Sequence, residues 1–135
     1  MGRIVVEPTG DEAEGRDNVD VVVWDGASLA GPRDVLDGAW LALRPEARAM
    51  IDAEAGGKLL LIAPAPADAG AEAARAGLEN LARTLSVEWA RYGIRTAALL
   101  PGEATTPDEV AELAGFLASK AGDYYSGCRF DLGSV

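Results

Sequence analysis

Three apolar runs, each followed by a helical pattern, constrain the fold of this chain more strongly than any other feature of its sequence. The runs are VDVVVW at 19–24, KLLLIA at 58–63 and IRTAALL at 94–100. Apolar runs without regular polar alternation are typical of strands that are covered on both faces of a sheet. Strands that alternate with helices predict an α/β fold whose sheet is mostly parallel and joined by right-handed crossovers.

Helical patterns fill the segments between and after these runs. The first is expected over residues 34–55, where Pro45 interrupts the pattern and predicts a kink or two helices that meet there. The longest is expected over residues 71–92, with one apolar stripe and with Gly93 as its C-cap. The third is expected over residues 106–119 and opens with Thr-Pro-Asp-Glu, a capping box with proline at the first helical position.

Both ends of the chain predict further strands, at residues 3–6 (RIVV) and at residues 130–132. Residues 11–18, DEAEGRDN, are expected to form a solvated linker, because the acid spacing does not match a calcium loop. The linker is short for a helical crossover, so the first strand is expected beside residues 19–24, with antiparallel pairing as the arrangement that a short linker allows. Residues 1–135 are thus expected to form a single domain with about five strands flanked by helices.

Histidine is absent from the sequence, and Cys128 is its only cysteine. A zinc or copper site is therefore not expected, and a Ser-His-Asp or Cys-His arrangement is impossible within one chain. One cysteine cannot form an internal disulfide, which fits a reducing cytosol, and Cys128 is expected to be buried and inert.

The net charge of −10 disfavours partners that are themselves negative. Nucleic acids and anionic membranes would be repelled by such a surface. No apolar run reaches the length of a membrane span, and the N-terminal residues MGRIVVEPTG lack the hydrophobic core of a signal peptide. The expectation is a cytoplasmic protein that binds neither nucleic acid nor membrane.

Four stretches carry a resemblance to a known family. They are VDVVVWDGA (19–27), GGKLLLIAP (56–64), RAGLENLARTLSVEWARYGIRTAALLPG (75–102) and TPDEVAELAGFLASKAGDYYSGCRFDLGS (106–134). In this order and spacing they resemble the short-chain dehydrogenases/reductases (SDRs). The first stretch matches the family's strand that is followed by the motif Asn-Asn-Ala-Gly, and the last stretch matches its final helix, turn and last strand. The opening residues RIVVEPTGD (3–11) are similar to the family's third strand. The resemblance implies an incomplete Rossmann-like fold and a family activity of NAD(P)-dependent oxidoreductase.

The same resemblance implies that the family's chemistry is missing. The position of the catalytic serine falls on Pro64, that of the tyrosine on Ala71 and that of the lysine on Arg75. The asparagine that completes the family's tetrad falls near Leu36, and no Gly-rich pyrophosphate loop occurs in these residues. Alanine cannot donate a proton, and arginine hardly ever releases one. Neither catalytic residues nor a bound NAD or NADP cofactor is therefore expected.

In the family, the helix that matches residues 71–92 also packs against its counterpart in a neighbouring subunit. Small side chains lie away from its apolar stripe and would permit close approach of a partner helix. They are Ala73, Ala76, Gly77, Asn80, Thr84 and Val87. The family also has subunit contacts near the turn that holds Tyr124 and Tyr125, and these residues are interpreted as interface residues. The simpler alternatives are a solvent-facing helix rich in alanine for its helix propensity, and tyrosines that only close the core.

The leading interpretation is a catalytically inactive subunit that oligomerises with itself or with an active SDR reductase. A residual oxidoreductase, or a small-ligand module at the carboxyl edge of the sheet near Asp25, Pro64 and 101–102, is the alternative. Arg75 could hold an anion there, although a salt bridge to Glu72 or Glu79 is the simpler interpretation. Packing at a helix end is favoured over catalysis for Tyr92.

Overall fold

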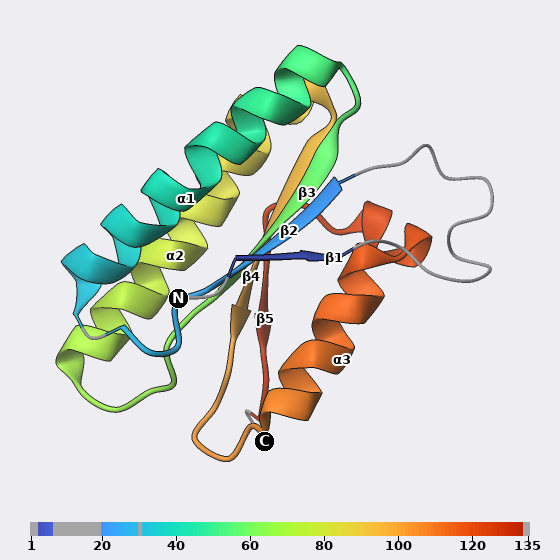
Figure 1. Cartoon of the computed structure of the whole chain (residues 1–135). Coiled ribbons are helices and arrows are strands. Elements are labelled where there is room, and N and C mark those ends of the chain that lie inside the picture. Colours follow the sequence, from blue (N-terminus) through green and yellow to red (C-terminus); the bar gives the residue numbers. More distant parts are fainter. Residues whose placement is uncertain (1–2, 7–19, 30, 134–135) are drawn as a thin grey trace.

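The computed structural model describes residues 3–6, 20–29 and 31–133 of the chain (Figure 1). The linker expected at residues 11–18 lies outside these described residues. Within them no helix is long and apolar enough to cross a membrane.

One five-stranded sheet forms the centre of the molecule. Its spatial order follows the chain: β1 (Arg3–Val6), β2 (Asp20–Asp25), β3 (Gly57–Ile62), β4 (Ile94–Leu100) and β5 (Cys128–Asp131). Strands β2 to β5 are parallel, as the alternation of strands and helices predicts. β1 is antiparallel to β2, with Arg3 opposite Trp24, which confirms the position expected for the first strand.

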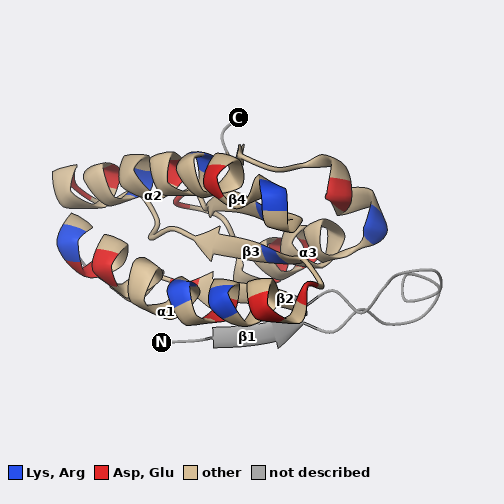
Figure 2. Ribbon diagram, turned by 90° about the horizontal axis from the view of Figure 1, so that it is seen from above, with Lys and Arg blue, Asp and Glu red and all other residues tan. Residues whose placement is uncertain are grey.

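Helices cover both faces of the sheet and make three layers (Figure 1). α1 (Pro32–Ala53) and α2 (Ala69–Glu88) lie side by side on one face, and α3 (Pro107–Ala118) lies on the other. Short 3₁₀ helices, η2 (Ala90–Tyr92) and η3 (Lys120–Tyr124), follow α2 and α3. Acidic and basic residues both occur along α1 and α2 (Figure 2).

The alternating faces of the buried strands build one core on each side of the sheet. Leu59 and Leu61 of β3 point into the core under α1 and α2, whereas Leu60 and Ile62 point into the core under α3. Both faces of β3 are therefore apolar, which explains its uninterrupted run of leucines.

The helix expected over residues 34–55 is a single helix, α1, and it contains Pro45 in its interior. Of the two arrangements expected at Pro45, a kink or two helices, the second was therefore wrong. Proline removes the N–H that would bond the carbonyl four residues earlier, which belongs to Leu41. Leu41 is two-thirds exposed and Pro45 is exposed too, so the interrupted hydrogen bond lies on the solvent side of α1 and the helix continues.

The end of α3 is held by a buried lysine that the sequence pattern did not reveal. Lys58 of β3 is 2% exposed and donates hydrogen bonds of 2.7 Å to the carbonyls of both Leu117 and Ser119. Its ammonium also lies 2.6 Å from a carboxylate oxygen of Asp123. A positive charge at a helix C-terminus is favourable, and these contacts fasten α3 to β3.

Candidate functional site

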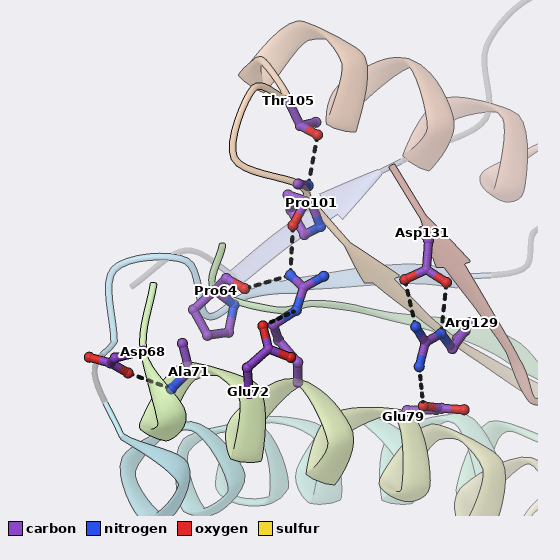
Figure 3. Close-up of polar contacts among 11 residues, drawn as sticks. Pro64, Asp68, Ala71, Glu72, Glu79, Pro101, Thr105, Arg129 and Asp131 are labelled. Carbon is purple, nitrogen blue, oxygen red and sulfur yellow. Dashed lines mark hydrogen bonds and ion pairs between the residues drawn. The ribbon is translucent and has the colours of Figure 1, made fainter. Parts of the chain in front are cut away.

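The carboxyl ends of β2, β3 and β4 meet at one edge of the sheet, where open α/β sheets bind their ligands. The residues singled out there come together as expected. Asp25 ends β2, while Pro64 follows β3 and Pro101 follows β4. Ala71 approaches this edge from the first turn of α2 (Figure 3), and Arg75 reaches it from the next turn.

Arg75 is 9% exposed and is hydrogen-bonded to the ends of two strands. Its Nη1 donates to the carbonyl of Pro64 at 2.9 Å and to that of Pro101 at 2.6 Å. Its Nε lies 3.9 Å from a carboxylate oxygen of Glu72, so the predicted Glu72 salt bridge is present at long range. The guanidinium thus holds α2 to the ends of β3 and β4 (Figure 3). Sequence reasoning missed the two carbonyls, because backbone acceptors leave no mark in the residue pattern.

Ala71 supplies only its backbone at the edge. Its N–H donates to Oδ1 of Asp68 at 2.8 Å, and Asp68 is the N-cap of α2. The side chain of Ala71 has no polar atom, so it cannot give or accept a proton at the family's tyrosine position.

Tyr92 lies beyond the far end of the same helix, beneath the guanidinium of Arg91.

Glu79, the other acid considered for Arg75, binds different arginines. Its two carboxylate oxygens lie 3.0 Å from Nη2 of Arg83 and 2.7 Å from Nη1 of Arg129. Arg129 also makes two 2.8 Å hydrogen bonds to Asp131 (Figure 3). These hydrogen bonds lower the pKa of Asp131 below its usual value and raise the pKa of Arg129. The cluster connects β5 to α2.

A cavity of about 490 Å³ opens at the carboxyl edge, between the sheet and α3. Its lining is mostly apolar and includes Val23, Ile62 and Val110. Among the described residues of its lining, Asp25 and Glu103 are acidic and none is lysine or arginine.

Five of the six small residues predicted as the α2 interface are exposed. They are Ala73, Ala76, Asn80, Thr84 and Val87. Gly77 is half-buried, and a Cβ placed on it would lie 2.8 Å from a methyl carbon of Leu36 in α1. The small size of Gly77 thus serves the contact between α1 and α2 within this chain.

Further exposed apolar groups extend this surface onto α1. Trp40 is 36% exposed and stacks on Trp89 with ring centroids 6.0 Å apart, and Leu41 is 67% exposed. Sequence reasoning did not select Trp40 and Leu41, although both fall off the buried stripe of α1.

The two tyrosines predicted as interface residues differ in their surroundings. Tyr124 is 90% exposed, whereas Tyr125 packs against Phe116 and Phe130.

Cys128 is half-buried at the start of β5, so the expectation of a buried thiol was wrong. The strand lies at the edge of the sheet, where its side chains alternate between half-buried and exposed positions. In the described part of the chain, no group of three or more His, Cys, Asp or Glu side chains is placed to hold a metal ion.

No family model matches the chain. Among curated proteins it is 36% identical over 128 residues to the "Probable 2,4-dienoyl-CoA reductase" of Bacillus subtilis, covering 69% of this chain and 50% of that protein. It is also 35% identical over 71 residues to an uncharacterised oxidoreductase of Mycobacterium tuberculosis, covering 47% of this chain and 26% of the relative. The chain therefore spans half or less of the length of these curated relatives.

Solved structures share the fold. Acetoin dehydrogenase from Enterobacter cloacae superposes with a TM-score of 0.71 at 24% identity, over 83% of this chain and 61% of that one. A short-chain dehydrogenase/reductase family oxidoreductase from Burkholderia thailandensis gives a TM-score of 0.70 at 21% identity, over 86% of this chain and 64% of that one.

Fold and sequence together define the class as an α/β protein related to oxidoreductases, with part of a Rossmann-like sheet. Within that class, the resemblance of this chain to the short-chain dehydrogenase/reductase family is confirmed.

Proposed function

We propose that this chain is a catalytically inactive, cytoplasmic SDR-like subunit that oligomerises with itself or with an active SDR reductase. The observation that carries the proposal is the state of α2 at the carboxyl edge of the sheet. An alanine stands at the family's tyrosine position, and the arginine at its lysine position binds two carbonyls of the chain itself.

A carbonyl reduction of the family's kind needs a proton donor beside the substrate. Ala71 offers none, and Nη1 of Arg75 already donates to the carbonyls of Pro64 and Pro101. Both of these positions lie inside α2, so the loss of the donor is the same whichever residues precede β1.

The carboxyl edge also suits a dinucleotide poorly. The 135 residues contain no Gly-rich loop to hold a pyrophosphate, and the cavity at this edge is lined by the carboxylates of Asp25 and Glu103.

The exposed face of α2 supports the assembly. Ala73, Ala76, Asn80, Thr84 and Val87 follow one another at steps of 3, 4, 4 and 3 residues, which is a palindromic spacing about Asn80. A two-fold axis at Asn80 would therefore bring two antiparallel copies of this face together, with each small residue opposite a matching position. The exposed Trp40 and Leu41 of the neighbouring helix α1 would extend the contact.

A residual NAD(P)-dependent oxidoreductase is the second candidate, and the identity to a dienoyl-CoA reductase is the observation that favours it. Such an activity would require a proton donor other than the residue at the family's tyrosine position.

Two measurements on the purified chain separate these functions. Calorimetric titration with NADH and with NADPH is expected to show no binding at physiological concentrations, whereas a micromolar Kd for either nucleotide would favour the enzyme. Light scattering is expected to give the mass of a dimer or tetramer. A monomer that also recovers no SDR reductase when purified from its own cells would contradict the subunit function.

A further inference from the structure

The cavity between the sheet and α3 has the size and surface of a binding site for a small organic molecule. Its volume of about 490 Å³ falls within the range of ligand sites, about 300–1,000 Å³. Val23 and Ile62 form its wall on the sheet, and Val110, Ala111 and Ala114 form its wall on α3. None of the residues assigned to the α2 interface lines this cavity, so the site is separate from the proposed assembly surface.

The charges at this cavity are negative and unpaired. Asp25 is half-buried and accepts the backbone N–H of Ala27 through Oδ1 at 2.8 Å. Glu103 is exposed on the loop after β4. Among the side chains of residues 21–29 and 31–133, neither carboxylate has a basic partner. A positive group placed in the cavity would meet two carboxylates and no lysine or arginine among the described lining residues, because the nearby Arg75 is hydrogen-bonded to the carbonyls of Pro64 and Pro101.

Four hydrogen-bond donors at and beside the cavity that could attract an anion are already used within the chain. The N–H of Gly102 donates to Oγ1 of Thr105 at 2.8 Å (Figure 3). That hydroxyl donates to the carbonyl of Leu132 at 3.2 Å. At the start of α3, the N–H of Thr106 donates to the side chain of Glu109 at 2.8 Å, and the N–H of Glu109 donates to the side chain of Thr106 at 3.2 Å. A helix N-terminus normally favours an anion, but this one already holds the carboxylate of Glu109.

We propose that this cavity binds a small hydrophobic amine: an apolar body between the sheet and α3, and an ammonium group beside Asp25 and Glu103. Apolar burial supplies the affinity, and the two carboxylates select the charge. The chemistry is opposite to that of a dinucleotide, whose phosphates need positive or N–H donor partners.

Three probes with one naphthalene ring test the charge preference. They are 1-naphthylmethylamine, 1-naphthalenemethanol and 1-naphthoate, each titrated into the whole chain by calorimetry. The amine is expected to bind about threefold to fivefold more tightly than the alcohol, because a partly exposed ion pair contributes up to about 1 kcal/mol, which is about fivefold. The carboxylate is expected to bind more weakly than both. A carboxylate that binds as tightly as the amine, or no binding by any probe, would overturn the proposal.

Two variants locate the binding. Asp25→Asn with Glu103→Gln keeps an acceptor for the Ala27 N–H and is expected to bring the amine to the affinity of the alcohol. Ala111→Phe places a ring in the cavity from an exposed position of α3 and is expected to weaken the amine and the alcohol about tenfold or more. Ala55→Phe adds the same ring in the exposed turn after α1 and should leave binding unchanged. Equal binding by the Ala111 variant, with its circular dichroism unaltered, would place the probes elsewhere and overturn the proposal.

Discussion

Arg75 stands at a position that the family uses for catalysis, but its contacts here are structural, and a substitution distinguishes the two roles. Arg75→Met would leave the carbonyls of Pro64 and Pro101 without their charged donor. We expect a loss of about 2–4 kcal/mol in the free energy of unfolding, because hydrogen bonds to charged groups contribute about 1.5–3 kcal/mol each. Urea unfolding followed by circular dichroism measures it.

The matched control is Arg83→Met on the same helix. Arg83 pairs with Glu79 in a largely exposed ion pair, which contributes about 0–1 kcal/mol. Equal losses for the two variants would show that the carbonyl contacts of Arg75 do not stabilise the fold.

Asp131 makes the stability depend on pH in the acid range. The hydrogen bonds from Arg129 lower its folded pKa below the value of 3.8 expected without them. The unfolded chain therefore takes up the proton first as the pH falls. The stabilisation is fully present above the unfolded pKa and is lost as the pH falls through the folded pKa. We expect Asp131→Asn to flatten this part of a plot of unfolding free energy against pH from about 2.5 to 7. Arg129→Met should flatten the same part, and an unchanged slope in both variants would contradict the assignment.

At single positions, the sequence could say which residue types occupy the family's catalytic places but not what they contact. Pro64, Ala71 and Arg75 do meet at the carboxyl edge, because strand ends and the first turns of the next helix converge there. The carbonyl partners of Arg75 and of Lys58 are contacts between residues that are 11 to 61 positions apart in the sequence. Local patterns carry no information at that separation.

Helix α1 contains a residue that weakens it. Pro45 lies inside the helix on its exposed side and cannot supply an N–H for the carbonyl of Leu41. We expect Pro45→Ala to raise the free energy of unfolding by about 1–3 kcal/mol, because proline costs about 3 kcal/mol more than alanine in a helix interior. Thermal unfolding by calorimetry measures the gain.

Ala49→Gly serves as the opposing control in the same helix, since Ala49 is also exposed and glycine should lower stability by about 1 kcal/mol. A loss of stability in Pro45→Ala would mean that the proline shapes α1 to fit the sheet or a partner.

Strands and helices were predictable wherever burial sets a regular pattern. Residues 94–100 form β4 as expected, and the capping box at Thr106 starts α3. α2 begins two residues before the expected position because Asp68 caps it, and it ends before η2. The exposed Trp40 and Leu41 were not predicted, because hydrophobic periodicity reports the core and not the surface.

The arrangement of the five strands followed from connection lengths. Long helical crossovers give parallel neighbours, and the short link between β1 and β2 gives an antiparallel pair. The likeness to solved dehydrogenases covers most of this chain but less than two-thirds of theirs, so it defines the fold and leaves assembly as a proposal.

The assembly proposal makes its sharpest prediction at Thr84, an exposed residue on the palindromic face of α2. In a two-fold dimer about Asn80, Thr84→Arg would place a charged side chain twice into a closely packed contact. A buried unpaired charge costs several kcal/mol, and about 3 kcal/mol would weaken a micromolar dimer by about 100-fold. We therefore expect light scattering to give the monomer mass at micromolar concentration.

The fold should survive this change, because Thr84 points away from the buried Leu85 and is exposed within one chain. Circular dichroism checks this, and Ala55→Arg, in the turn after α1, adds the same charge away from the proposed contact and should leave the mass unaltered. A Thr84→Arg variant that keeps the mass of the unmodified chain would place this face of α2 in solvent. The palindromic spacing would then reflect helix propensity alone, and any oligomer would have to use another surface, such as the exposed Tyr124 beside β5.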